Sequence, residues 1–302
     1  MISFIILNYN NATLSLKCVA SIKQYIPQES YEVIMVDNGS RPDDYQQLRE
    51  GLQGLDRCQL LRKEVNTGFG TGNMVGASVA QGQFLCFLNN DVLLVEDCVT
   101  PLCRYMQKHT DVGCMTPVQQ KVDGRRSRSF RQDSGFWHEL VGDSVRERLF
   151  PKHFPPRDII LKVSDQPVSV MQINGSFMLF DANKFWAIGG FDTSIFLYYE
   201  EYDLAKRLHL RGWHCMVHPK YTFLHVHDAS TSSMRRLTLK ENFVSKIYTY
   251  RKYHGTLPSL CFQGLITLKL LFKPKKWYIL PVSLSGKVLR HSMRYRAGGG
   301  RG

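Results

Sequence analysis

Short apolar runs alternate with amphipathic stretches over the first ninety residues of the chain. The runs ISFIIL (2–7) and YEVIMVD (31–37) are rich in β-branched residues, and residues 11–24 between them have helical spacing. Two further runs, 59–64 and 83–91, also predict strands. This β-α-β order predicts an α/β fold with a mostly parallel sheet flanked by helices.

The later pattern adds helices to this sheet. Three stretches have helical spacing: 71–81, 95–109 and 202–214, the last ending at Gly212. Residues 168–192 predict two short elements, a helix and a Gly-Gly turn. The polar, basic segment 119–135 predicts a mobile loop.

Charge divides the chain into two parts. The protein has 302 residues, 43% of them hydrophobic, which is enough for one sizeable core or two small ones. Residues 241–302 hold twelve of its 39 Lys and Arg but one of its 26 Asp and Glu. We therefore expect a domain over residues 1–240 and a basic helical extension over residues 241–302. Such an extension suits an anionic membrane face or nucleic acid, or is a solvated tail without a partner.

Cysteine usage and hydropathy bear on the compartment. The eight cysteines form no CxxC pair and several lie in apolar runs, which indicates reduced core residues of a cytosolic protein. The run 2–7 has no basic stretch before it, so we interpret it as a strand and expect no signal peptide. The later apolar run 257–272 is too short to span a membrane and carries Lys269.

Polar motifs follow the predicted strands, where ligands bind in open α/β sheets. Asp37 in VDNGS (36–40) either accepts a hydrogen bond from a base or ribose, or closes an Asx-turn with Gly39. The segment NTGFGTGN (66–73) lets backbone approach a ligand or is a plain loop. It is not a GxGxxG placed after the first strand, which argues against a nucleotide-sugar oxidoreductase.

Two later motifs offer metal ligands. In FLNND (87–91), Asn89 and Asp91 are two apart and would point to the same side of an extended chain. Such oxygens suit Mg²⁺ or Mn²⁺ when a diphosphate supplies the remaining charge. The segment FLHVHDAS (223–230) offers His225 and His227, which are either structural or further ligands.

Three carboxylates crowd together in FLYYEEYDLAKR (196–207). Glu200, Glu201 and Asp203 stand behind aromatic residues, so mutual repulsion and poor solvation should raise a carboxyl pKa toward working pH. That environment suits a general base. The alternative is a helix N-terminus enriched in acids, where Asp203 is spaced to pair with Arg207.

These motifs form an ordered series: VDNGS, NxGFxxGN, FLNND, GxFML with GGFD, FLYYEEYDL and then His. The series resembles the family 2 glycosyltransferases, inverting enzymes with the GT-A fold. It is most similar to the bacterial rhamnosyltransferases of O-antigen and cell-wall polysaccharide synthesis. The resemblance covers residues 2–231 and implies a GT-A-type, Rossmann-like catalytic domain.

The resemblance also implies residue roles. Glu201 stands at the family's catalytic aspartate and is the implied base, with Glu200 orienting acceptor or base. Asp91 and His225 are the implied ligands of Mg²⁺ or Mn²⁺, with Asn89 in place of the first acid of D-x-D. The implied donor-binding positions lie in the matched motifs: Asn8, Asp37, Asn66, Gly68, Asn73, Asn89, Asn90 and Gly175.

By resemblance, the reaction is the inverting transfer of one sugar from a nucleotide-sugar donor to a hydroxyl of a polyprenyl-diphosphate-linked saccharide. L-Rhamnose from dTDP-rhamnose is the first expectation, and a UDP-hexose donor is the close alternative. The alternative from another class is a nucleic-acid-binding protein that uses the tail and GRRSRSFR (124–131).

The basic residues lie outside the motif-rich region, so we expect no nucleic-acid partner. We expect a cytoplasmic enzyme at the inner face of the plasma membrane, held peripherally by the amphipathic stretch 257–280 on anionic lipid.

Overall fold

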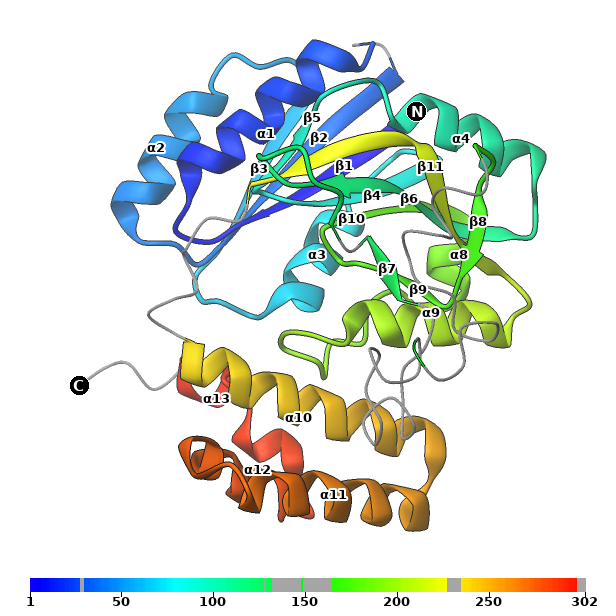
Figure 1. The fold of residues 1–302 in the computed structure, drawn as a ribbon. Helices are drawn as coiled ribbons and strands as arrows, with labels where there is room; N and C mark the ends of the chain where they lie inside the picture. Colours follow the sequence, from blue (N-terminus) through cyan, green and yellow to red (C-terminus); the bar gives the residue numbers. More distant parts are fainter. Residues whose placement is uncertain (28–29, 128, 132–147, 149–164, 227–234, 298–302) are drawn as a thin grey trace.

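A twisted sheet in the order β3-β2-β1-β4-β10-β6-β11-β5, with β8 paired to β11, runs through the main part of the protein (Figure 1). The computed structural model describes residues 1–27, 30–127, 129–131, 148, 165–226 and 235–297. The strands of this sheet are β1 (Ile2–Asn8), β2 (Tyr31–Asn38), β3 (Cys58–Lys63), β4 (Phe84–Asn89), β5 (Val92–Leu94), β6 (Val112–Gln120), β8 (Val168–Val170), β10 (Phe177–Asp181) and β11 (His214–His225).

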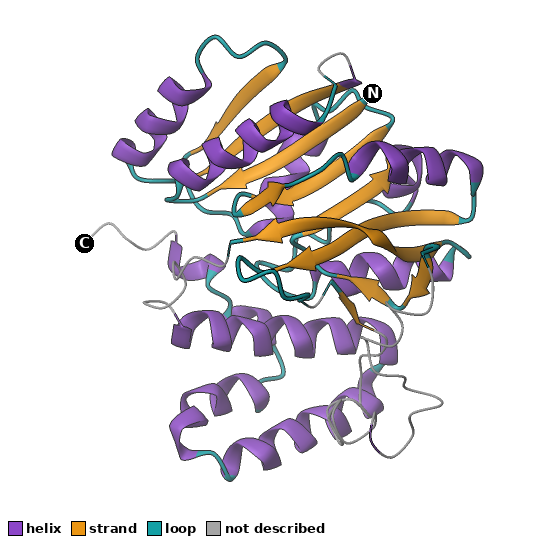
Figure 2. Cartoon of the chain, turned by 45° about the horizontal axis from the view of Figure 1, so that its top comes forward, coloured by secondary structure: helices purple, strands orange, loops and turns teal. Residues whose placement is uncertain are grey.

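Helices cover both faces of the sheet (Figure 2). They are α1 (Ala12–Tyr25), α2 (Pro42–Leu52), α3 (Phe69–Ala77), α4 (Val99–Lys108), α8 (Ala182–Ala187) and α9 (Glu200–Leu210). One buried cluster joins the sheet to α1, α2 and α4, and a second joins the opposite face to α3, α8 and α9. Strands β1 to β4 are parallel, and β10 runs antiparallel between β4 and β6. The predicted α/β fold with a mostly parallel sheet is confirmed.

The glycine-rich motif brings a helix unusually close to the sheet. A Cβ atom at Gly72 would lie 2.5 Å from the Leu7 side chain, and one at Gly76 would lie 2.6 Å from Ile5. Helix α3 therefore packs directly on β1, and its first turn, at Phe69, stands at the carboxyl edge of the sheet.

Aromatic packing holds the GGFD turn against the strand that carries FLNND. The ring of Phe87 in β4 lies 4.9 Å from that of Phe191 and 5.0 Å from that of Phe185. Each such pair is worth about 0.5–1.5 kcal/mol beyond the burial of its area. Two motifs more than a hundred residues apart in the chain are thereby fixed to each other.

Helices after the last strand form a second layer under α9 (Figure 1). They are α10 (Arg235–His254), α11 (Thr256–Leu271), η3 (Pro274–Ile279), α12 (Leu280–Ser283), η4 (Val288–His291) and α13 (Arg294–Ala297). All of them except α13 share a cluster of their own, which includes Ile247, Phe262 and Ile266. The expected boundary at residue 240 falls inside α10. None of the described helices is long and apolar enough to cross a membrane.

Candidate active site

A chain of hydrogen bonds joins the carboxyl ends of β1, β2 and β4. Asn90 Nδ2 donates to Ser15 Oγ (3.2 Å), and this hydroxyl donates to Asn8 Oδ1 (2.8 Å). Asn8 Nδ2 donates in turn to Asp37 Oδ1 (3.0 Å) and Asp44 Oδ2 (2.9 Å). The structure therefore brings Asn8, Asp37 and Asn90 together, as parallel strands require.

The side chains at these strand ends differ in exposure, and this decides which of them could contact a ligand directly. Asn8 and Asp37 are fully buried, so any effect of Asn8 on a ligand passes through its hydrogen bonds. Arg62, in the neighbouring strand β3, lies 3.9 Å from Asp37 Oδ2 and 3.9 Å above the Tyr45 ring. Arg62 and Tyr45 are partly exposed beside the carboxyl ends of the strands, and their planar groups are chemically suited to stack on a base.

The segment around Asn66 is tied to both β2 and the acid motif. Asn38 Nδ2 donates to Asn66 Oδ1 (3.0 Å) and to the Gly68 carbonyl (3.2 Å). The Phe69 amide donates to the carbonyl of Phe196 (2.8 Å). Gly68 has φ +87°, and a Cβ there would lie 2.2 Å from that carbonyl, so glycine is required. Asn73 is buried and its Oδ1 has no hydrogen-bond partner among the described residues.

Asp91 and His225 lie in direct contact although 134 residues separate them. His225 ends β11, which pairs with β5 directly after Asp91, and its Nε2 atom lies 2.9 Å from Asp91 Oδ1. The expectation that Asn89 and Asp91 point to the same side of one extended strand is wrong, because β4 ends at Asn89 and Asp91 lies in the following turn. His227 falls outside the described residues.

The donor set at this point fits a hard divalent cation. A carboxylate oxygen and an imidazole nitrogen suit Mn²⁺, and the amides of Asn89 and Asn90 lie in the adjoining residues. In the part of the chain that the structure describes, no three His, Cys, Asp or Glu side chains are arranged so that they could hold a metal ion by themselves. Asp91 and His225 would therefore hold a cation together with ligand oxygens, as a bound diphosphate supplies them.

The acid motif begins α9 after two strained residues. Tyr198 and Tyr199 have φ +69° and +72°, values that bulky side chains rarely adopt. Backbone strain of this kind costs about 1–3 kcal/mol per residue and clusters at functional sites. It turns the chain sharply, so that Glu200 and Glu201 fall in the first turn of the helix, where its dipole favours negative charge.

The three acids of this motif differ in environment. Glu200 is buried, its Oε1 has no hydrogen-bond partner among the described residues, and burial followed by the charge of Glu201 raises its pKa well above the ordinary value. Burial also raises the pKa of Glu201, while the Arg131 guanidinium acts in the opposite direction. Asp203 is fully buried and paired with Arg207, which is the structural role its spacing predicted.

A polar cavity of about 260 Å³ opens beside Glu201. Its lining comes from four separate parts of the chain: Arg131, Gln172, Tyr198, Tyr199, Glu201, Tyr202, Asn242 and Lys246. Arg131 and Gln172 face each other in the register of β7 (Phe130–Arg131) and β9 (Gln172–Ile173). A half-buried carboxylate with a raised pKa in a polar cavity is the arrangement of a general base.

The cavity and the strand edge belong to one region. The amide of Asn89 donates to the carbonyl of Ser176 (3.0 Å), and Gln172 is four residues before Ser176. Four residues span at most about 14 Å. Gly175 lies between them, and open space faces the position where its Cβ would be.

Sequence reasoning missed Arg62, Arg131, Gln172, Asn242 and Lys246. Arg131 belongs to the basic stretch 124–131, which lies outside the sequence motifs, but its pairing with β9 places it at the cavity. Lys246 lies in the part of the chain assigned to the tail. The partner of Asp37 in β3 could have been found, because the register of two parallel strands places Arg62 opposite Asp37.

Comparison with known proteins agrees with this architecture. The model of glycosyl transferase family 2 matches residues 3–179. The chain is 26% identical over 216 residues, 66% of its length, to N-acetylglucosaminyl-diphospho-decaprenol L-rhamnosyltransferase from two strains of Mycobacterium tuberculosis, of which the match covers 67%.

Two solved structures share the fold at low identity. A mannosyltransferase, PcManGT from Pyrobaculum calidifontis with GDP-Man and Mn²⁺, aligns with a TM-score of 0.59 at 14% identity, over 100% of this chain and 75% of that one. GalNAc-T7 with UDP, GalNAc and Mn²⁺ aligns with a TM-score of 0.56 at 16% identity, over 94% of this chain. The match spans about half (51%) of the GalNAc-T7 chain.

Proposed function

Because this chain belongs to glycosyl transferase family 2, we propose that it transfers a single sugar, with inversion, from a nucleotide-sugar donor to a hydroxyl of a lipid-linked saccharide. The observation that carries this proposal is Glu201, a half-buried carboxylate of raised pKa at a cavity lined by amides and tyrosines. The proposed donor is dTDP-L-rhamnose. A UDP-hexose is the alternative, since uracil and thymine present the same ring N–H to an acceptor.

In the proposed reaction Glu201 removes the proton of the acceptor hydroxyl as its oxygen attacks the anomeric carbon. The new carbon–oxygen bond forms on the face opposite the leaving group, and the bond to the diphosphate breaks with its electron pair going to the nucleotide. Glu200, buried behind Glu201, orients the base through their shared helical turn. The raised pKa brings the base closer to working pH, which favours proton transfer.

Asp91 and His225 would hold Mn²⁺ or Mg²⁺, with Asn89 and Asn90 beside them. The chemistry that a bound divalent cation supplies is neutralisation of charge on the leaving diphosphate. Two solved proteins of the same fold contain Mn²⁺ with a nucleotide or nucleotide sugar, which supports a metal here. The remaining donor contacts are proposed at the Asn66–Gly68 segment, Asn73 and Gly175.

The proposed acceptor is N-acetylglucosamine linked through a diphosphate to a polyprenol. The support is the printed activity of the mycobacterial relatives, which carry a sugar directly on a diphospho-decaprenol. Such an acceptor lies in a membrane. We therefore propose that the enzyme works at the cytoplasmic face of the plasma membrane, on anionic lipid and without a nucleic-acid partner.

The surface of α11 supports a peripheral membrane location. Phe262, Ile266 and Leu270 are buried in the C-terminal cluster, but other apolar side chains of this segment are exposed: Leu257, Leu260, Leu268, Leu271 and Phe272. Lys273, Lys275 and Lys276 follow directly, and Trp277 is half exposed. Exposed apolar side chains next to lysines suit the interface of an anionic bilayer.

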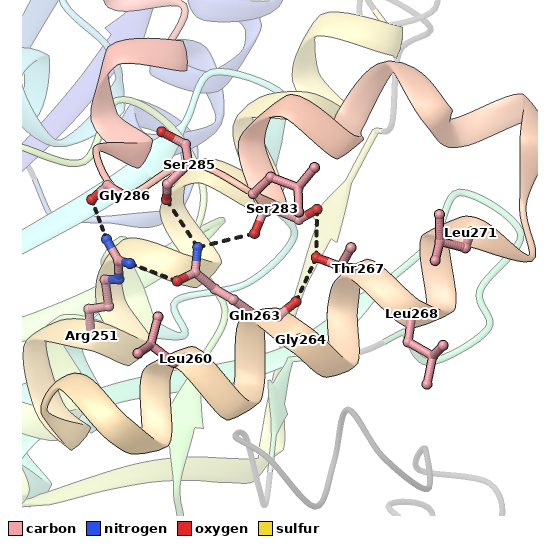
Figure 3. Close-up of a pocket in the computed structure, with 11 residues that line it drawn as sticks. Arg251, Leu260, Gln263, Gly264, Thr267, Leu268, Leu271, Ser283, Ser285 and Gly286 are labelled. Carbon is pink, nitrogen blue, oxygen red and sulfur yellow. Dashed lines mark hydrogen bonds between the residues drawn. The ribbon is translucent and has the colours of Figure 1, made fainter.

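Figure 3 shows the groove that Leu260, Leu268 and Leu271 border. It has a volume of about 530 Å³ and lies between α11 and α12. At its floor the amide of Gln263 accepts from Arg251 (2.7 Å) and donates to the Ser285 carbonyl (3.2 Å). Gln263 Nε2 also donates to the carbonyl of Ser283, the last residue of α12 (3.3 Å), so this hydrogen bond joins the two helices.

The test is a transfer assay with the full chain. Purified protein is incubated with dTDP-L-rhamnose, UDP-glucose, UDP-galactose or UDP-N-acetylglucosamine, with Mn²⁺ or EDTA, and with a short-chain polyprenyl diphosphate N-acetylglucosamine. Mass spectrometry detects the added sugar, and NMR of the product gives the anomeric configuration. Turnover with dTDP-L-rhamnose and an inverted linkage is the expected result. A retained configuration would exclude the proposed single displacement.

A further inference from the structure

The cavity beside Glu201 is lined by charged side chains that the binding of a sugar hydroxyl alone does not require. Two cationic side chains, Arg131 and Lys246, line it together with the amides of Gln172 and Asn242. Neutral amides bind hydroxyls well, whereas Arg and Lys bind phosphate oxygens. This lining fits a ligand that carries both hydroxyls and an anionic group.

Gln172 gives a second, independent indication of a ligand. Its residue is 2% exposed and lines the cavity, yet its Oε1 atom has no hydrogen-bond partner in the part of the chain that the structure describes. A buried acceptor without a partner is unfavourable. A hydroxyl or amide N–H of a bound ligand would remove that cost by donating to it.

The size of the cavity limits the ligand. Its volume of about 260 Å³ has room for a single sugar ring. Tyr199 and Tyr202, whose rings lie 6.1 Å apart at the wall, provide aromatic surface for the apolar face of such a ring.

We propose that this cavity is the acceptor subsite, and that it binds one sugar whose anomeric carbon carries a phosphate or diphosphate. Lys246 and Arg131 contact the phosphate oxygens, and Gln172 accepts from a hydroxyl or acetamido group. The inference rests on the proposed function, because the acceptor is defined by the assignment of Glu201 as base. Since Lys246 belongs to α10, the C-terminal helices take part in recognising the acceptor itself.

The diphosphate of the donor could satisfy the same cations, so the experiment has one arm for each source. Calorimetry on the full chain compares N-acetylglucosamine 1-phosphate, N-acetylglucosamine and inorganic phosphate in the acceptor arm. The donor arm uses dTDP and UDP with Mn²⁺. The sugar phosphate should bind more tightly than either the neutral sugar or phosphate alone.

Variants identify the residues responsible. Lys246→Gln and Arg131→Gln should each weaken binding of the sugar phosphate about tenfold or more, the range for a hydrogen bond to a charged group. Lys246→Arg keeps the charge and should retain most of the affinity. Lys240→Gln changes a lysine of the same helix that does not line the cavity, and should have no effect. Melting temperatures establish that each variant is folded.

Three results would overturn the assignment. The first is a wild-type protein that does not prefer the phosphorylated sugar. The second is an equal loss of affinity for neutral and phosphorylated sugar in Lys246→Gln, which would mean that Lys246 maintains the shape of the cavity and does not bind the phosphate. The third is a loss of affinity in Lys246→Gln and Arg131→Gln that is confined to dTDP and UDP, which would mean that both side chains bind the diphosphate of the donor.

Turnover separates this inference from the proposed function. If no nucleotide sugar supports transfer, the proposed function fails, while the binding experiment still decides whether the cavity holds a sugar phosphate. If transfer occurs, the ratio of KM for the diphosphate-linked acceptor to KM for the octyl glycoside of the same sugar should rise about tenfold in Lys246→Gln. An unchanged ratio would contradict the inference.

Discussion

Lys252 Nζ, on α10, lies 2.6 Å from Asp203 Oδ1, on α9, and 2.7 Å from Asp192 Oδ2, in the GGFD turn. Tyr253 Oη donates to the same Asp203 oxygen (2.6 Å), and Tyr248 Oη donates to Asp192 (3.0 Å). The helix after the last strand thus ties together two motifs of the candidate site. A lysine from the basic C-terminal segment is here bound to one buried and one partly buried acid.

Removing this lysine should destabilise the whole protein. We expect Lys252→Met to lower the free energy of unfolding by about 3 kcal/mol, because the buried Asp203 loses one of its two cationic partners and Arg207 remains. Urea unfolding followed by circular dichroism measures the change. Lys17→Met, on the exposed side of α1, should change it by less than about 0.5 kcal/mol. Equal stability of both variants would show that the network contributes nothing.

Glu201→Gln tests the base. Transfer should fall about 10²-fold or more, since the proton acceptor is lost while shape is kept. Binding of the nucleotide, measured by calorimetry, should survive. If Glu201→Gln turns over almost normally and Glu200→Gln does not, the base is Glu200.

The pH profile gives a second readout of the same group. Burial raises the pKa of Glu201 above its ordinary 4.5, so the acid limb of kcat/KM should lie above pH 4.5. The Arg131 guanidinium lowers this pKa, so Arg131→Gln should move the limb to higher pH. A limb that stays in place in Arg131→Gln would mean that Arg131 does not act on the base.

Glu200 should lower the free energy of unfolding of the protein at neutral pH. Burial and the charge of Glu201 raise its pKa in the folded protein, so its protonated form favours folding fully below pH 4.5 and this contribution is lost as pH rises toward the folded pKa. Glu200→Gln should therefore match wild type at pH 4.5 and be more stable at pH 8, by a gap that opens by up to about 1.4 kcal/mol per pH unit. Thermal unfolding at both pH values measures the gap. A variant that is less stable at pH 8 would show that the ionised carboxylate is satisfied.

Asp91→Asn tests the metal. Donor affinity and turnover should fall together, and EDTA should have the same effect on wild type, because the diphosphate would lose its link to the protein. Calorimetry with dTDP, with and without Mn²⁺, measures the affinity. Asp97→Asn, at a carboxylate that instead accepts from the amides of Val99 and Thr100, serves as the control. Full activity of wild type in EDTA would exclude a metal role.

The local pattern predicts strands and the order of motifs well, because burial sets the apolar runs and turns follow them. β1 and β2 begin at the first residue of their predicted runs and end one residue later, and β4 differs from its run by one residue at the start and two at the end. The local pattern does not predict contacts between residues that are far apart in the chain. Nothing local in Lys246 or Lys252 distinguishes them from the lysines of a solvated tail, yet one lines the cavity and the other is bound to Asp203. Likewise Arg131 is placed by its pairing with Gln172, more than forty residues away.

The outer side of α11 allows a membrane test that leaves the fold intact. Truncation after residue 256 would remove Phe262 and Ile266 from the cluster that they form with Ile247, so it would damage the core. Substitution of exposed residues avoids this problem. Leu268 and Phe272 are 53% and 80% exposed, so glutamine there should change stability by less than about 0.5 kcal/mol.

We expect the full chain to float with vesicles that contain anionic lipid, and Leu268→Gln with Phe272→Gln to abolish most of this binding, since buried apolar area anchors an interfacial helix. Changing Lys273, Lys275 and Lys276 to glutamine should weaken binding by about 1 kcal/mol per lysine, or roughly fivefold each, and high salt should mimic this loss. Leu210→Gln, at an exposed leucine of α9, is the matched control. If the Leu268→Gln and Phe272→Gln protein floats like wild type, α11 is not the anchor, and the exposed leucines contact another protein surface.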